Sequence, residues 1–185
     1  MIQQKRYWLI ALFLLIADQA SKAWATAKLK PVGVIEVWPE VFRFSYALNR
    51  GVAFSLFADV EFNIKWVLAA ISGVAAVLVM YYLAHTPRSE RLMSFSLALL
   101  LSGIVGNLID RVHLGEVVDF IEFHWRDQFI WPTFNIADAT ICIGAVLLGF
   151  VLMREERAER TRQQNVLPEN PPQNQIEDTH VELAE

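Results

Sequence analysis

The stretch WVLAAISGVAAVLVMYYLA, residues 66–84, runs for nineteen residues without a charged side chain. A helix of about 20 residues crosses the hydrocarbon core of a bilayer, so this stretch predicts a membrane-spanning helix. Two more apolar stretches follow, eighteen residues at 92–109 and fifteen at 139–153. The composition, 55% hydrophobic, also points away from an ordinary soluble domain.

The N-terminal stretch, from about Tyr7 to Trp24, predicts a fourth span. It shares features with a cleavable signal peptide, because Lys5 and Arg6 precede an apolar stretch and small residues follow it. However, Asp18 and Lys22 lie between the apolar stretch and those small residues. We therefore interpret the segment as an uncleaved anchor.

The distribution of Lys and Arg predicts the orientation in the membrane, because cytoplasmic loops are rich in both. With four spans, the basic N-terminus, the loop at 85–91 and the arginine-rich stretch after the last span share one side. The opposite loops, about 28–62 and 110–136, are longer and hold six Lys and Arg in total. Both termini are therefore expected in the cytoplasm, with both long loops facing outward.

The outward loops carry strand patterns. VFRFSYAL (41–48) alternates apolar and other residues with period two, and 34–38 can pair with it across a turn at 39–40. The second loop holds EVVDFIEF (116–123) and FIWPTF (129–134). We predict an all-α membrane protein, a bundle of four transmembrane helices with a small sheet on its outer face.

The C-terminal end differs in composition from the rest of the chain. Residues 163–185 are polar and contain proline, which predicts disorder. The chain is therefore expected to divide into an integral membrane domain, 1–155, and a cytoplasmic, disordered tail, 156–185. No feature indicates nucleic-acid binding, and the single cysteine cannot form a disulfide within the chain.

Polar residues collect near the outer ends of the predicted spans, while the inner halves carry almost none. This one-sided cluster is what a site at the outer membrane surface would produce. Its members are Asp18, Lys22, Asn49, Asn107, Asp110, Arg111, Asp119, Asn135 and Asp138.

Four of these residues also have purely structural interpretations as pairs. Asp18 and Lys22 are four apart on one helix face and can form an ion pair that eases insertion. Asp110 and Arg111 can form an ion pair at a helix end. Neither interpretation requires a catalytic site.

Other members of the cluster can be explained by local backbone structure. Asn49 and Gly51 suit a turn, and Asp138 can occupy the first turn of a helix, where the dipole favours an anion. Asp119 is harder to explain in this way. It stands alone in the apolar stretch VVDFI, where a buried carboxylate needs a partner.

The residue types restrict the chemistry. The four histidines are scattered, no HExxH or CxxC motif occurs, and no Gly-rich phosphate loop is present, so neither a metal nor a cofactor is predicted. Two neighbouring carboxylates cannot both ionise easily. One can then activate a water while the other donates a proton, which hydrolyses an amide. Asp119 and Asp138 are the pair that the sequence favours.

Four blocks together resemble the bacterial lipoprotein signal peptidases, also called signal peptidase II, an aspartic peptidase family. The resemblance extends over about residues 5–155, and the C-terminal tail falls outside it. The blocks are ADQASKAW (17–24), NRGVAFS (49–55), SGIVGNLIDR (102–111), and VVDFI (117–121) with FNIADATI (134–141).

The resemblance implies a bundle of four transmembrane helices with a small periplasmic β-cradle. It also implies an inner-membrane enzyme that cleaves diacylglyceryl-modified prolipoproteins on the N-terminal side of the lipidated cysteine. It implies Asp119 and Asp138 as the catalytic pair, membrane lipid around the site, no metal or cofactor, and inhibition by the cyclic peptide globomycin. A monomer is expected. Supporting or substrate-binding roles are implied for Asp18, Lys22, Asn49, Gly51, Asn107, Arg111 and Asn135, and close packing for Gly51, Gly103 and Gly106.

Two other functions remain open on the residues alone. A proton-coupled transporter would use the same carboxylates as a relay, but it predicts ionisable groups through the whole membrane thickness. A non-catalytic membrane scaffold would need neither Asp119 nor Asp138.

Overall fold

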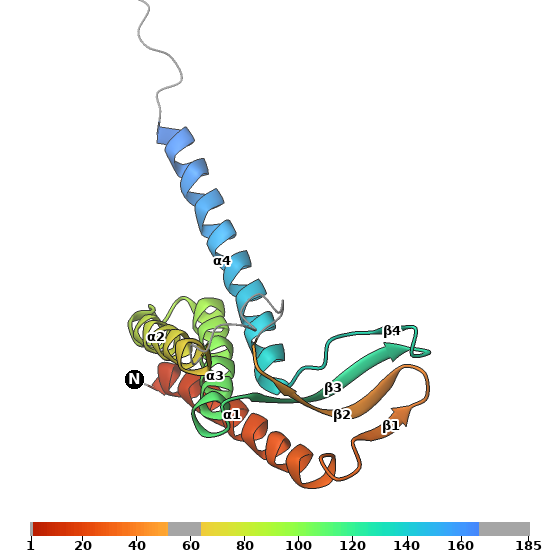
Figure 1. Cartoon of the computed structure of the whole chain (residues 1–185). Coiled ribbons are helices and arrows are strands. Elements are labelled where there is room, and N and C mark those ends of the chain that lie inside the picture. The colour runs from red at the N-terminus through yellow and green to blue at the C-terminus, as the bar shows by residue number, and fades with distance from the viewer. Residues whose placement is uncertain (1, 52–63, 167–185) are drawn as a thin grey trace, which may run out of the picture. The chain divides into compact units, whose positions relative to one another are not determined.

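Four long helices contain most of the described residues (Figure 1). The computed structural model describes residues 2–51 and 64–166. All four helices are long and apolar enough to cross a membrane, which confirms the four predicted spans of a multi-pass membrane protein. They are α1 (Ile2–Lys28), α2 (Ile64–His85), α3 (Arg91–His113) and α4 (Ile136–Val166).

The last helix is longer than the apolar stretch that predicted it. It continues to Val166, so residues 156–166 of the tail that was predicted to be disordered are helical. The rest of the predicted tail, 167–185, lies outside the described residues, as do residues 52–55 of the NRGVAFS block. The contacts divide the chain into two units, Met1–Gly149 and Phe150–Glu185. The division at residue 155 stays a prediction.

Helix α3 is the central helix of the first unit. In its most apolar stretch, 61% of the residues are buried, against 17–22% in the other three helices. The difference arises because α3 packs against both α1 and α2. Its buried serines donate their hydroxyl protons to carbonyl oxygens three or four residues earlier, in the same helix or at its N-cap, so each of these hydroxyl groups has a partner.

Two glycines allow the other helices to approach α3 closely. A Cβ atom at Gly103 would collide with the main-chain oxygen of Ala137 at the start of α4. A Cβ atom at Gly106 would lie 2.5 Å from a carboxylate oxygen of Asp18 on α1. Small residues at these points bring the polar residues of three helices within hydrogen-bonding distance of one another.

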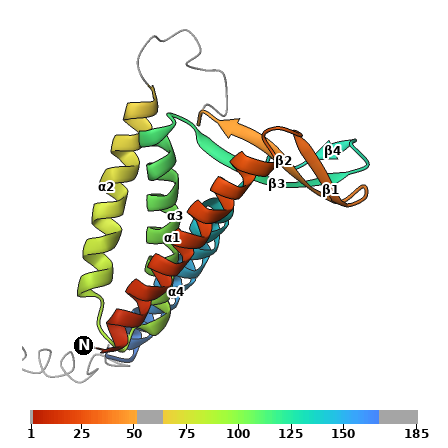
Figure 2. The same cartoon turned by 90° about the horizontal axis from the view of Figure 1, so that it is seen from below.

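The strands form one antiparallel sheet in the order β1-β2-β3-β4. Their positions confirm the predicted strands and the turn between the first two, except that of residues 129–134 only Phe129–Ile130 form a strand. Figure 2 shows that the sheet leaves the helices beside the end of α1 and the start of α2. The strands are β1 (Val34–Trp38), β2 (Phe42–Asn49), β3 (Val117–Trp125) and β4 (Phe129–Ile130).

The first half of β3 is anchored on α1. Val118 and Phe120 are buried against Ala25 and Leu29, which lie near the C-terminal end of that helix. Side chains of a strand alternate between its two faces, so Asp119, between these two anchors, points to the opposite face. The packing of β3 therefore holds this carboxylate beside the ends of the helices.

Candidate active site

Asp119 is a buried carboxylate that accepts a hydrogen bond on each oxygen. Only 2% of the residue is exposed. The side-chain amide of Asn49 on β2 donates to Oδ2 at 3.0 Å, and that of Asn135 donates to Oδ1 at 2.7 Å. The register of the sheet, in which Ala47 pairs with Asp119, places Asn49 two residues away on the neighbouring strand.

Asp138 lies in the first turn of α4 and forms a reciprocal cap with Asn135. The main-chain N–H of Asp138 donates to Asn135 Oδ1 at 2.8 Å, and the main-chain N–H of Asn135 donates to Asp138 Oδ2 at 3.2 Å. Asp138 therefore has the helix-terminal position that its structural interpretation predicted. Its second oxygen, however, accepts from the Asn107 side chain on α3 at 2.7 Å.

Asn135 connects the two carboxylates. It donates through its side chain to Asp119 and through its main chain to Asp138, so both acids lie around one residue. Burial, and to a smaller extent the negative charge of Asp138, raise the pKa of Asp119 from 3.8 to about 6, against the hydrogen bonds from Asn49 and Asn135 and the positive charge of Lys22, which lower it. The two carboxylates are thus close enough to interact electrostatically, as expected for groups that titrate together.

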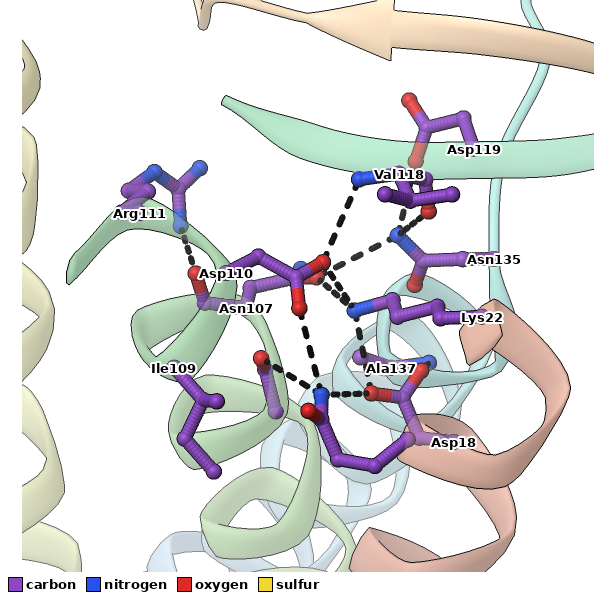
Figure 3. A network of polar contacts seen from close by, with 12 residues as sticks. Asp18, Lys22, Asn107, Ile109, Asp110, Arg111, Val118, Asp119, Asn135 and Ala137 are labelled. Carbon is purple, nitrogen blue, oxygen red and sulfur yellow. Dashed lines mark hydrogen bonds and ion pairs between the residues drawn. The ribbon is translucent and has the colours of Figure 1, made fainter. Parts of the chain in front are cut away.

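Lys22 forms the centre of a second group of contacts (Figure 3). Its ammonium lies 3.0 Å from Asp18, 2.9 Å from Asp110 and 3.0 Å from the Asn107 side-chain oxygen. The i,i+4 pair expected within α1 is therefore present, but Lys22 also joins α1 to α3. Asp18 in turn accepts from the main-chain N–H of Ala137 at 2.9 Å, which connects α1 to the start of α4.

The predicted ion pair between Asp110 and Arg111 is wrong. Neighbouring residues on a helix point about 100° apart. Asp110 therefore points to Lys22 and to the main-chain N–H of Val118, whereas Arg111 donates to the main-chain oxygen of Asn107 at 3.4 Å. In Figure 3 Arg111 lies away from the carboxylates. Its supporting role stays a prediction.

The turn predicted at Asn49 is also part of the site. The main-chain N–H of Gly51 donates to Asn49 Oδ1 at 2.8 Å, and Gly51 has a φ of 75°, which favours glycine. A Cβ atom at Gly51 would also meet the Leu68 side chain at 2.5 Å. The turn holds the oxygen of the Asn49 amide, so its nitrogen faces Asp119.

Gln19 is a member of the network that our sequence analysis missed. Its side-chain nitrogen lies 3.1 Å from Asp18, 3.2 Å from Asp110 and 3.2 Å from the main-chain oxygen of Gly106. A signal was available, because Gln19 is a polar residue within the same helical turn as Asp18. Within residues 2–51 and 64–166, no three His, Cys, Asp or Glu side chains are grouped so that they could hold a metal ion.

The sequence comparisons agree with this architecture. The family model described as Signal peptidase (SPase) II matches residues 10–154. A lipoprotein signal peptidase of Pseudomonas fluorescens (strain Pf0-1) is 38% identical over 151 residues, which are 81% of this chain and 89% of the relative. A lipoprotein signal peptidase of Clostridium tetani (strain Massachusetts / E88) is 39% identical over 145 residues, 78% of this chain and 90% of the relative.

Two solved structures of a bacterial membrane enzyme, determined by the in meso method, share the fold. Their TM-scores are 0.69 and 0.70 at 29% and 30% sequence identity. The similarity covers 82% and 80% of this chain, and 90% and 92% of those chains. The resemblance seen in the sequence motifs thus extends over most of the chain and over the fold, and the chain belongs to the signal peptidase II family.

Proposed function

We propose that Asp119 and Asp138 are the catalytic pair of this peptidase. The chain is a lipoprotein signal peptidase, an aspartic endopeptidase that removes the signal peptide from prolipoproteins. The observation that carries the assignment of the pair is the shared position of the two carboxylates around Asn135, one of them buried and the other at a helix N-terminus.

Two carboxyl groups with one proton between them suffice for the reaction. The ionised carboxylate takes a proton from a water molecule, and the water oxygen bonds to the carbonyl carbon of the scissile amide. The protonated carboxyl donates to the carbonyl oxygen, which gives a neutral diol. The first acid then protonates the amide nitrogen, the second takes back a hydroxyl proton, and the carbon–nitrogen bond breaks.

The residues around the pair restrict the positions of both acids. Asn49, Asn107 and Asn135 donate to carboxylate oxygens and hold them in place. Lys22, with its partners Asp18 and Asp110, joins α1 to α3, and Asp18 also joins α1 to the start of α4. Hydrolysis by this route needs only the two carboxyl groups and a water molecule.

The finer features of the substrate and of the location belong to the proposal. The signal peptide is itself an apolar helix, and a diacylglyceryl group on the cysteine would remain in the bilayer, so both can reach the site from the lipid. We expect cleavage on the N-terminal side of the lipidated cysteine by a monomer. The distribution of Lys and Arg supports cytoplasmic termini and a site at the opposite face. The family supports the bacterial inner membrane, which makes that face the periplasmic one.

The transporter alternative is not supported. The family match and the curated relatives are peptidases. The ionisable residues of the network also gather at one end of the helices, near the sheet, instead of continuing through them. A relay across the membrane would need such groups at successive depths.

The test is incubation of the purified protein with a diacylglyceryl-modified precursor and with its unlipidated twin. We expect cleavage of the lipidated precursor alone, and loss of cleavage in both Asp119→Asn and Asp138→Asn. The control is Glu40→Gln, which removes an exposed carboxylate that pairs with Arg126 on the sheet. Full processing by either aspartate variant would reject the catalytic pair. The alternative of a non-catalytic membrane scaffold predicts unchanged processing in both variants.

A further inference from the structure

Each of the three amides at the site is held in one orientation by a donor to its oxygen. Lys22 donates to the oxygen of Asn107, the main-chain N–H of Asp138 to that of Asn135, and the main-chain N–H of Gly51 to that of Asn49. An amide whose oxygen accepts must turn its NH₂ group to the other side. Each NH₂ group consequently faces a carboxylate.

Lys22 differs from the other two donors because it is a buried cation. Its side chain is 4% exposed, and an ammonium has three N–H donors. The three donors are used by Asp18, Asp110 and Asn107. Lys22 therefore has no N–H donor left for the substrate. It can act on the reaction through its hydrogen-bond partners or through its charge, which lowers the pKa of Asp119.

The connection from Lys22 leads to one member of the catalytic pair. Asn107, held by Lys22 at 3.0 Å, donates to Asp138 at 2.7 Å. Asp138 also accepts the main-chain N–H of Asn135 and lies at the N-terminus of α4, where a negative charge is favoured. Asp119 has two amide donors, but it is buried in the sheet, and burial disfavours its charged form by more than the charge of Lys22 favours it.

We propose that Lys22 is a positioning residue of the hydrolysis: through the side-chain amide of Asn107 it makes Asp138 the ionised member of the pair and leaves the proton on Asp119. The inference rests on the proposed function. Asp138 is then the base that activates water, and Asp119 is the acid that protonates the carbonyl oxygen. The other ionisable groups of the described network are Asp18 and Asp110, both of which pair with Lys22 itself.

The test measures the acidic limb of the pH profile of kcat/KM, which reports the base in the free enzyme. Removal of Lys22 alone would leave Asp18 and Asp110 buried without a cation, so the comparison is made in the Asp110→Asn background. There Lys22→Gln restores the net charge that the cluster has in the wild type. We expect this change to move the acidic limb to higher pH by about one unit, because a hydrogen bond that stabilises a carboxylate has that size.

The same change is then made with Asn107→Ala also present. If Lys22 acts through Asn107, the removal of Lys22 in this background moves the limb no further. An equal shift with and without Asn107 would overturn the proposal, because Lys22 would then act by its charge at a distance. No shift in either background would leave Lys22 a purely structural residue and would also overturn it.

A second variant covers the case in which the Lys22 variants do not fold. Asn107→Asp keeps the size of the side chain and keeps an oxygen partner for Lys22, but it replaces the N–H donor that faces Asp138 with an anion. We expect the acidic limb to move to higher pH, and an unchanged limb would overturn the proposal. Failure of the proposed function would differ, because the wild type itself would then not cleave the lipidated precursor.

Discussion

Replacement of Asp119 by Asn should abolish cleavage and yet stabilise the folded protein at neutral pH. The pKa of Asp119 is raised from 3.8 to about 6, first by burial and then by the charge of Asp138. In the folded state the carboxyl therefore keeps its proton to a higher pH than in the unfolded state. As pH rises from about 4 to above 6, the unfolded state loses this proton first, so the free energy of unfolding falls.

The size of the effect follows from the shift. A difference of about two pKa units corresponds to about 3 kcal/mol at pH 7.5, and only about 0.5 kcal/mol remains at pH 4. The introduced amide would turn its NH₂ group toward one of the two amides that now donate to the carboxylate, which costs about 1 kcal/mol at any pH. The variant should thus be about 2 kcal/mol more stable than the wild type at pH 7.5 and slightly less stable at pH 4.

The assay is thermal or denaturant unfolding of both proteins in the same detergent between pH 4 and 7.5. The difference between the two proteins removes the contributions of the other ionisable groups to first order. The control is Glu40→Gln, whose carboxylate is exposed, and its stability relative to the wild type should not change with pH. A pH-independent difference between Asp119→Asn and the wild type would contradict the account of Asp119 as a buried acid that carries the proton.

Two further predictions concern the pH profile and the helix packing. With Asp119 as the acid, kcat/KM of the wild type should decline above about pH 6. Asn49→Ala should move this alkaline limb to higher pH by about one unit, because it removes a hydrogen bond to the charged form of Asp119. The control Arg50→Gln removes a neighbouring exposed ion pair and should leave the limb in place, and equal limbs in all three proteins would exclude this role of Asn49. Gly103→Ala should lower the free energy of unfolding by about 1–3 kcal/mol, because the new Cβ would collide with the main-chain oxygen of Ala137. The control is Gly149→Ala, whose Cβ would meet no atom within 4 Å, so this change should leave the stability unchanged. Equal stability of the two variants in detergent would contradict the packing of α3 on α4.

Much of the architecture could be predicted from local patterns. In lipid, a long apolar segment has to satisfy its backbone hydrogen bonds internally, so residues 66–84 and 92–109 could hardly be other than helices. Period-two alternation likewise located β2, and the apolar, β-branched composition around Asp119 located β3. Asp119 itself was identified because a lone carboxylate in an apolar strand is energetically unfavourable without a partner.

The partners of these polar residues could not be predicted in the same way. Lys22 was expected to pair with Asp18, but nothing in the spacing indicates that it also binds Asp110 and Asn107, which are more than eighty positions away. The choice between Asp110 and Arg111 as the residue that faces α1 depends on the rotation of α3 about its axis. Packing at Gly103 and Gly106, together with the register of β2 on β3, sets such rotations and distances. Periodicity describes each segment alone, whereas hydrogen bonds between segments depend on how their surfaces fit together.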